Sequence, residues 1–192
     1  MVLANDNLPI PTGPRYRPHQ WPYPWGPPEA EFPGIVPINT LQFERSKQAA
    51  IAIIGIAAYT AGFEIFVTHR IRPGAHGIAR GDPTPDVPGA LPAALRSFHL
   101  GLQFADGGKA ISGRLYLGPG PDSEPTGPIL RPVGGDIQFS RWWGWPLPPS
   151  GPLEFVCEWP KFGVAETRVG IDAQLILDAA RRSVQLWPEN DG

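Results

Sequence analysis

Residues 141–166, RWWGWPLPPSGPLEFVCEWPKFGVAE, contain the longest run in the chain that is typical of a half-buried β-strand. In LEFVCEW, residues 153–159, every second residue is apolar, and Glu154 and Glu158 occupy alternate positions between them. This period of two places one face of a strand in a core and the other toward solvent. The turn-forming letters WPKFG follow, so the next segment is expected to return antiparallel.

Two further hairpins extend the pattern toward the N-terminus. Residues 63–72 alternate after a Thr-Ala-Gly turn, and residues 98–104 alternate before an Asp-Gly-Gly turn. Residues 48–59 are rich in alanine, which suits a helix, but their β-branched isoleucines and Gly55 favour a strand. Shorter strand candidates are residues 35–43, 109–117, 129–133, 136–145 and 164–171.

A single helix is predicted, at residues 172–186. Asp172 is a favourable N-cap, and the following residues to 185 contain no glycine or proline. Ile176, Ala179 and Val184 belong to one apolar stripe at helical spacing. The fold class is therefore mainly β: an antiparallel β-sandwich, immunoglobulin-like or C2-like in outline, with one C-terminal α-helix and a proline-rich N-terminal arm.

Residues 1–34 are predicted to form an extended arm rich in proline and aromatic residues, and residues 35–192 the sandwich domain. Proline at every second to fourth position disfavours both helices and sheet ladders. The arm also carries Trp21 and Trp25, whereas a purely solvating tail would not usually carry such rings. We expect the arm either to pack across its own domain or to bind a partner that reads polyproline segments, including a symmetry-related copy.

The overall composition excludes several classes of partner. The formal net charge of −2 provides no field that would attract nucleic acid or anionic lipid. The most apolar stretch, residues 49–58, is too short to cross a bilayer, and the N-terminus lacks the pattern of a secretory signal. A single cysteine, Cys157, allows no intramolecular disulfide and favours a reducing compartment. We therefore expect a cytoplasmic protein with no nucleic-acid or membrane partner.

No catalytic motif is present: nucleophile-elbow, phosphate-loop, dinucleotide-binding and metalloprotease patterns are all absent from the sequence. Cys157 alternates with apolar residues and is expected to be a small core hydrophobe. Glu154 and Glu158 lie roughly 13 Å apart along a strand, which is too far for the paired carboxylates of a glycosidase. We therefore predict no catalytic residue, no cofactor and no enzyme activity.

Metal binding has only weak support in the sequence. His69 and His99 lie on predicted strands that would bring them together only if those strands pair, and no spacing supplies a third ligand. His69 is expected to be a buried or rim histidine. The loop aspartates contain no clustered calcium motif, so no metal site is predicted. Those aspartates are Asp82, Asp86, Asp106, Asp122 and Asp136.

The three tryptophans Trp142, Trp143 and Trp145 are the candidate binding residues, together with Trp21 and Trp25 of the arm. On a strand, Trp143 and Trp145 share one face and Trp142 takes the other. Three interpretations are open. The rings are core or pack against the arm, they form an exposed platform for a protein partner, or they bind a sugar.

Part of the chain resembles a known group of sequences. Residues 145–167, WPLPPSGPLEFVCEWPKFGVAET, and residues 175–189, LILDAARRSVQLWPE, resemble small uncharacterised proteins predicted from actinobacterial genomes. Residues 57–72, AAYTAGFEIFVTHRIR, look like the central hairpin of the same group. The resemblance covers residues 35–188 and leaves the aromatic arm outside. No established activity belongs to this group, so the resemblance implies no function, cofactor or site residue.

The leading functional hypothesis is a non-catalytic β-sandwich that acts through protein–protein contacts, with another protein or as a homo-oligomer. The alternative is a small-ligand or carbohydrate-binding module that uses Trp142, Trp143 and Trp145. A third hypothesis, an enzyme built on loop acids with His69 or His99, rests on the fewest features.

Overall fold

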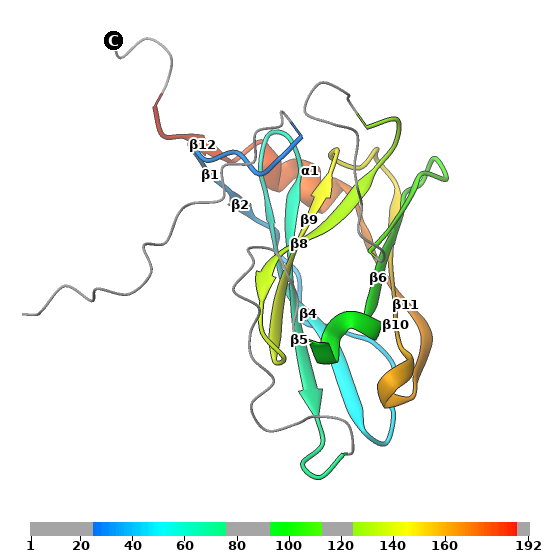
Figure 1. The fold of residues 1–192 in the computed structure, drawn as a ribbon. Helices are drawn as coiled ribbons and strands as arrows, with labels where there is room; N and C mark the ends of the chain where they lie inside the picture. The colour runs from blue at the N-terminus through cyan, green and yellow to red at the C-terminus, as the bar shows by residue number, and fades with distance from the viewer. Residues whose placement is uncertain (1–24, 76–92, 113–124, 188–192) are drawn as a thin grey trace, which may run out of the picture.

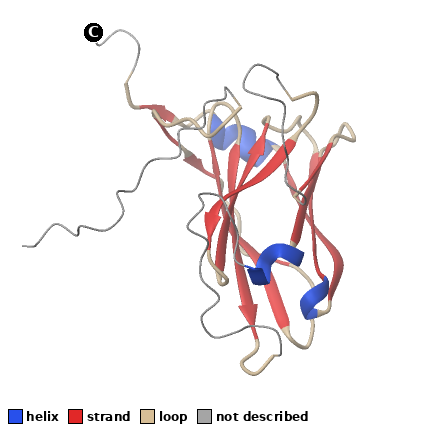
Figure 2. Ribbon diagram, in the orientation of Figure 1, coloured by secondary structure: helices blue, strands red, loops and turns tan. Residues whose placement is uncertain are grey.

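Two antiparallel sheets pack face to face in the computed structural model of the protein, which describes residues 25–75, 93–112 and 125–187 (Figures 1 and 2). The larger sheet has the order β2-β4-β5-β9-β8, with β3 also paired to β4, and the smaller sheet has the order β11-β10-β6-β7. The predicted antiparallel β-sandwich with one α-helix near the C-terminal end is confirmed. The strands of the two sheets are β2 (Gly34–Ile35), β3 (Leu41–Gln42), β4 (Ala49–Ala58), β5 (Phe63–Ile71), β6 (His99–Gln103), β7 (Lys109–Ile111), β8 (Ile129–Gly135), β9 (Phe139–Trp145), β10 (Pro152–Trp159) and β11 (Val164–Asp172).

A third, two-stranded sheet joins the two ends of the described chain. It consists of β1 (Glu31–Phe32) and β12 (Val184–Gln185), which pair antiparallel and project from one end of the sandwich (Figure 1). We call this element the ribbon. β1 lies within the segment that the sequence analysis assigns to the arm, whereas residues 1–24 of that arm lie outside the described residues.

The β4–β5 hairpin shows why the alanine-rich segment is a strand. Its isoleucines alternate into the core, and β4 pairs with β5 along its whole length. The register shifts between Ile53 and Gly55, so Ile54 is an extra residue that bulges outward and is exposed. The β-branched residues therefore decide the structure of this segment, as predicted.

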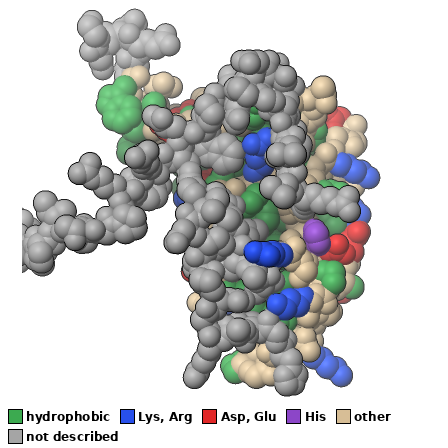
Figure 3. Space-filling model, viewed as in Figure 1, with side chains coloured by type: hydrophobic (Ala, Val, Ile, Leu, Met, Phe, Trp, Pro, Cys, Tyr) green, Lys and Arg blue, Asp and Glu red, His purple; other side chains and the backbone are tan. Residues whose placement is uncertain are grey.

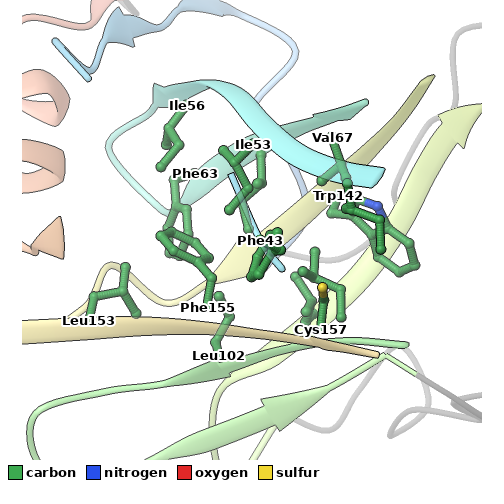
Figure 4. Close-up of a cluster of buried hydrophobic side chains, with 14 of the residues drawn as sticks. Phe43, Ile53, Ile56, Phe63, Val67, Leu102, Trp142, Leu153, Phe155 and Cys157 are labelled. Atoms are coloured by element: carbon green, nitrogen blue, oxygen red, sulfur yellow. The ribbon is translucent and has the colours of Figure 1, made fainter. Parts of the chain in front are cut away.

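The core lies between the two sheets (Figure 4). Ile53 and Val67 of the larger sheet face Leu102 and Phe155 of the smaller one, and all four side chains are buried. Cys157 lies in the same layer, where burial raises the pKa of its thiol to about 12. The prediction that Cys157 is a core hydrophobe is confirmed, because such a thiol is neither exposed nor ionised at neutral pH.

The helix is shorter than the 172–186 expected from the apolar stripe. α1 spans Gln174–Ala180 with Ala173, not the expected Asp172, at its N-cap position. An Asp172 oxygen accepts a hydrogen bond from the Gln174 N–H at 2.9 Å at the start of the helix. Val184 belongs to β12 and is exposed, because pairing with β1 replaces further helical turns. Two short 3₁₀ helices, Ala93–Ser97 and Pro160–Phe162, complete the described elements.

His69 is enclosed between the sheets and is 1% exposed. Its ring lies edge-on to Phe98, at 4.8 Å between ring centres, and to Trp159, at 5.4 Å. Its Nε2 lies 3.5 Å from the hydroxyl of Ser140. Burial lowers the pKa of His69 to about 4, against a smaller opposing effect of the Asp136 charge. His69 is therefore neutral in the folded protein at neutral pH.

This burial makes the stability of the fold depend on pH. The pKa of His69 is 6.5 before burial and about 4 after it, so its neutral form stabilises the fold fully above pH 6.5. The stabilisation is lost as the pH falls from 6.5 to 4, and the loss reaches about 3 kcal/mol at pH 4. We predict that His69→Phe, which keeps an aromatic ring, no longer loses this stability in acid. The measurement is the free energy of unfolding from urea titrations at neutral and acidic pH.

The control is Ile111→Ser, an exposed uncharged position on the smaller sheet, which leaves His69 in place and should retain the pH dependence of the natural chain. Glu64 acts in the opposite direction, because its burial raises the pKa of the carboxyl and its protonation therefore favours the fold in acid. An unchanged acid loss in His69→Phe would show that another group causes it.

Candidate interaction surface

The adjacent tryptophans of β9 point to opposite faces of the larger sheet. Trp142 enters the core between the sheets, where it is 2% exposed and donates a hydrogen bond from Nε1 to the Ser140 hydroxyl at 2.8 Å. Trp143 is fully buried on the other face. The expected alternation along the strand is therefore present, but neither of these two rings forms an exposed platform, since both faces of β9 are covered.

Trp25, in the part of the arm that the structure describes, covers the outer face of β9. Nε1 of Trp143 donates a hydrogen bond to the Trp25 carbonyl at 2.8 Å, and the Trp25 side chain is itself buried. Tyr59 lies edge-on to Trp143, with 5.6 Å between ring centres. Gly62 admits the Trp143 ring, because a Cβ at this glycine would lie 2.7 Å from the ring. Of the other candidates, Trp145 is half-buried and Trp21 lies outside the described residues.

A polar group lies beside Trp143 on the same face. Glu64 is buried, and a guanidinium nitrogen of Arg141 lies 3.7 Å from its carboxylate. Burial raises the pKa of Glu64, and burial together with the Glu64 charge raises the pKa of Tyr59 to about 12. Tyr59 therefore stays protonated at neutral pH. This arrangement fixes side chains around Trp143 and provides no activated nucleophile.

The two histidines with candidate roles do not meet. His69 lies in the core on the larger sheet, whereas His99 lies on the outer face of the smaller sheet with Nδ1 at 3.3 Å from the Ser112 carbonyl. Glu154 on that outer face forms an ion pair with Arg168 at 3.1 Å. Among the described residues no three His, Cys, Asp or Glu side chains gather as metal ligands, and Asp82, Asp86 and Asp122 fall outside this part of the chain.

A shallow groove crosses the outer face of the smaller sheet above Gly101. Ile111 and Val156 stand on either side of this glycine in the sheet register, and the groove encloses about 190 Å³. Its rim carries Lys109 and Glu158 among other polar side chains. Ligand pockets usually enclose about 300 Å³ or more, so the groove can admit one side chain more readily than a small molecule.

Exposed apolar side chains gather on the ribbon. Six large hydrophobic side chains are strongly exposed in the described part of the chain, and four of them lie on or next to the ribbon. Hydrophobic side chains are visible there at the upper left of Figure 3. We call these four residues the ribbon patch: Phe32, 63% exposed, Ile35, 67%, Val184, 57%, and Trp187, 67%.

The ribbon is held to the domain by one carboxylate. Glu31 is buried and accepts hydrogen bonds from the Thr60 N–H at 3.1 Å, the Thr60 hydroxyl at 3.2 Å and the Ser183 hydroxyl at 3.0 Å. These bonds connect β1 to the β4–β5 turn and to the residue before β12. Because Glu31 faces inward, Phe32, the next residue of β1, faces outward.

Sequence reasoning missed most of this surface. The sequence pattern places Val184 in the apolar stripe of a helix, and it gives no role to Ile35 or Trp187. The available signal is the alternation in Ser183-Val184-Gln185-Leu186, which suits a short strand as well as a helix.

No family model, curated protein or solved structure matches the chain. In the part of the chain that the structure describes, no helix has the length and apolar character needed to cross a membrane.

The Glu31 anchor gives a direct test of how the ribbon is attached. Glu31→Ala removes the charged acceptor of the Thr60 N–H and hydroxyl, whereas the Ser183 hydroxyl keeps the Ala180 carbonyl as an acceptor. We therefore expect a loss of about 1–3 kcal/mol in the free energy of unfolding, measured by urea titration, because hydrogen bonds to charged groups are the stronger ones. Glu29→Ala, a substitution of an exposed carboxylate two residues earlier, is the control and should change stability little. Equal stability of both variants would contradict the anchoring role.

Proposed function

We propose that this protein is a non-catalytic interaction module that binds protein through the ribbon patch. The observation that carries the proposal is the concentration of exposed apolar side chains on one projecting element (Figure 3). The other two strongly exposed large hydrophobics, Ile54 and Ile111, lie singly on different sheets and need no explanation.

The size of the patch supports a protein partner. Aromatic side chains bury about 150–250 Å² each, so Phe32 and Trp187, each about two-thirds exposed, present roughly 250 Å², to which the smaller side chains of Ile35 and Val184 add. Monomeric proteins rarely expose larger apolar patches, and patches of this size are often functional. Phe32 and Trp187 are the residue types that commonly dominate the energy of a protein interface.

The alternative of a ligand module based on the tryptophan cluster has less support. Trp142 and Trp143 have no exposed ring face to stack on a sugar. The groove above Gly101 is smaller than usual ligand pockets and contains no tryptophan. We also infer that the protein is not an enzyme, since the buried carboxylates Glu31 and Glu64 are held by hydrogen bonds or an ion pair and His69 is enclosed in the core.

The proposal predicts that binding depends on the aromatic residues of the patch. The full chain, immobilised and exposed to an extract of its source cells, should retain a defined set of proteins, counting the chain itself among them. The double variant Phe32→Ser, Trp187→Ser should lose that set, because two large contact surfaces are removed. Retained proteins would be quantified by mass spectrometry.

The control is the double variant Ile54→Ser, Ile111→Ser, which removes two exposed hydrophobics elsewhere and should retain the same proteins as the natural chain. Both double variants should keep the natural circular dichroism spectrum, since only exposed side chains change. Undiminished binding by Phe32→Ser, Trp187→Ser would refute the role of the ribbon patch.

A further inference from the structure

We propose that one end of the β4–β5 hairpin carries a binding site for a small ligand with clustered phosphate groups. The site is a shallow pocket of about 340 Å³, which reaches the lower range of small-molecule sites, about 300–1,000 Å³. Four basic side chains line it, and none of its described lining residues is an acid. We call it the basic pocket, after Arg45, Lys47, Arg70 and Arg72.

The loop before β4 holds two of these cations in place. The Ser46 hydroxyl accepts a hydrogen bond from the Gln48 N–H at 3.0 Å and donates one to the Phe162 carbonyl at 2.6 Å. Ser46 is thereby tied to the connection between β10 and β11, while its neighbours Arg45 and Lys47 are exposed and line the pocket. The loop therefore presents two cations from a fixed backbone.

The end of β5 supplies the other two cations. Because His69 points into the core, Arg70 points to the outer face of the sheet, where it is exposed. Arg72 follows on the same face, roughly 7 Å along the strand, and its N–H continues the ladder to the Gln48 carbonyl at 2.7 Å. One guanidinium nitrogen of Arg70 donates to the carbonyls of His69 and Gln138, which fixes its orientation. The pocket is thus bounded by two segments that are bonded to each other.

The four cations of the basic pocket have no carboxylate partner among the described residues, whereas Arg141, Arg168 and Arg181 each form an ion pair. They are four of the sixteen Lys and Arg residues of a chain whose net charge is −2. Like charges gathered in this way repel one another, and a bound anion removes the repulsion. The pocket therefore selects a negatively charged ligand.

The amount of positive charge favours phosphate. A phosphate monoester carries about −1.5 to −2 at neutral pH, so two phosphate groups balance four cations. Three of the four cations are arginines, whose guanidinium groups suit phosphate because they donate two parallel hydrogen bonds. No aromatic ring of the described residues lines the pocket, so a nucleic-acid strand would find no surface on which its bases stack. The ligand class that fits is a diphosphate or bisphosphate.

The basic pocket is separate from the ribbon patch. It lies where Ala49 pairs with Ile71, whereas the ribbon is anchored beyond the other end of the hairpin, where Ala58 pairs with Phe63. β4 has ten residues, so the two ends are roughly 30 Å apart (Figure 1). The inference therefore adds a second site to the proposed function and does not depend on it.

Isothermal titration calorimetry of the full chain with inorganic pyrophosphate tests the site. The natural chain should bind one equivalent, with an affinity that falls as salt is added. It should bind orthophosphate at least about 10-fold more weakly, because a single phosphate balances only half of the positive charge. Absence of pyrophosphate binding, or equal affinity for the two anions, would overturn the proposal. Binding of a hexaglutamate peptide as tight as that of pyrophosphate would overturn phosphate as the ligand class.

Sedimentation with vesicles identifies the source of the phosphate groups, which a free ligand or a lipid headgroup can carry. The vesicles contain phosphatidylcholine with or without phosphatidylinositol bisphosphate. Co-sedimentation that requires the bisphosphate lipid and is reversed by pyrophosphate would support a headgroup in the pocket. Pyrophosphate binding without co-sedimentation would support a free ligand.

A pair of double variants tests the position of the site. Lys47→Gln, Arg72→Gln removes one cation from each segment and should weaken pyrophosphate binding at least about 10-fold. The matched control Lys109→Gln, Arg181→Gln removes the same charge elsewhere and should bind as the natural chain does. All four side chains are exposed, so both double variants should keep the natural circular dichroism spectrum. Equal weakening in the two double variants would show attraction by net charge alone and would overturn the pocket.

Discussion

Burial of both faces of β9 is the constraint on which the rest of the structure depends. Trp142 and Trp143 are neighbours in the sequence, so in a strand one must enter the core and the other must face outward. Leaving either ring in water would cost about 2–3 kcal/mol. The smaller sheet covers Trp142, and the segment that begins at Trp25 covers Trp143 and accepts its indole hydrogen bond. The segment that covers Trp143 then continues to the ribbon.

The ribbon follows from this course of the chain. After Trp25 the backbone reaches β1, where Glu31 meets the β4–β5 turn and Ser183. The inward carboxylate leaves Phe32 outside, and β12 supplies Val184 beside it. An apolar surface thus arises where the two ends of the sandwich sequence are joined. Its side chains add nothing to the core, and this is why we assign them to contact with another molecule.

The sequence predicts the sandwich because most of its strands carry their own signal. The alternation in residues 63–72 and 153–159 is a local pattern, and by itself it indicates a half-buried strand. β1 carries no such signal, and the short alternation at β12 suits a helix equally well, since each strand has two residues and their partners lie about 150 positions apart, as the Glu31–Ser183 bond shows. The predicted length of α1 is wrong for the same reason, because pairing with β1 overrides the local helical pattern at Val184. The buried state of Trp143 depends on Trp25, so the sequence leaves it open.

Hydrogen–deuterium exchange of the natural chain, alone and with the proteins that it retains, tests the central claim most directly, because it reports each segment without any substitution. Contact through the ribbon patch predicts slower exchange in residues 29–36 and 182–187 when the retained proteins are present, and unchanged exchange in β6 and β7. Exchange in the ribbon that the retained proteins do not change, or protection that appears on β6 and β7 instead, would contradict the account.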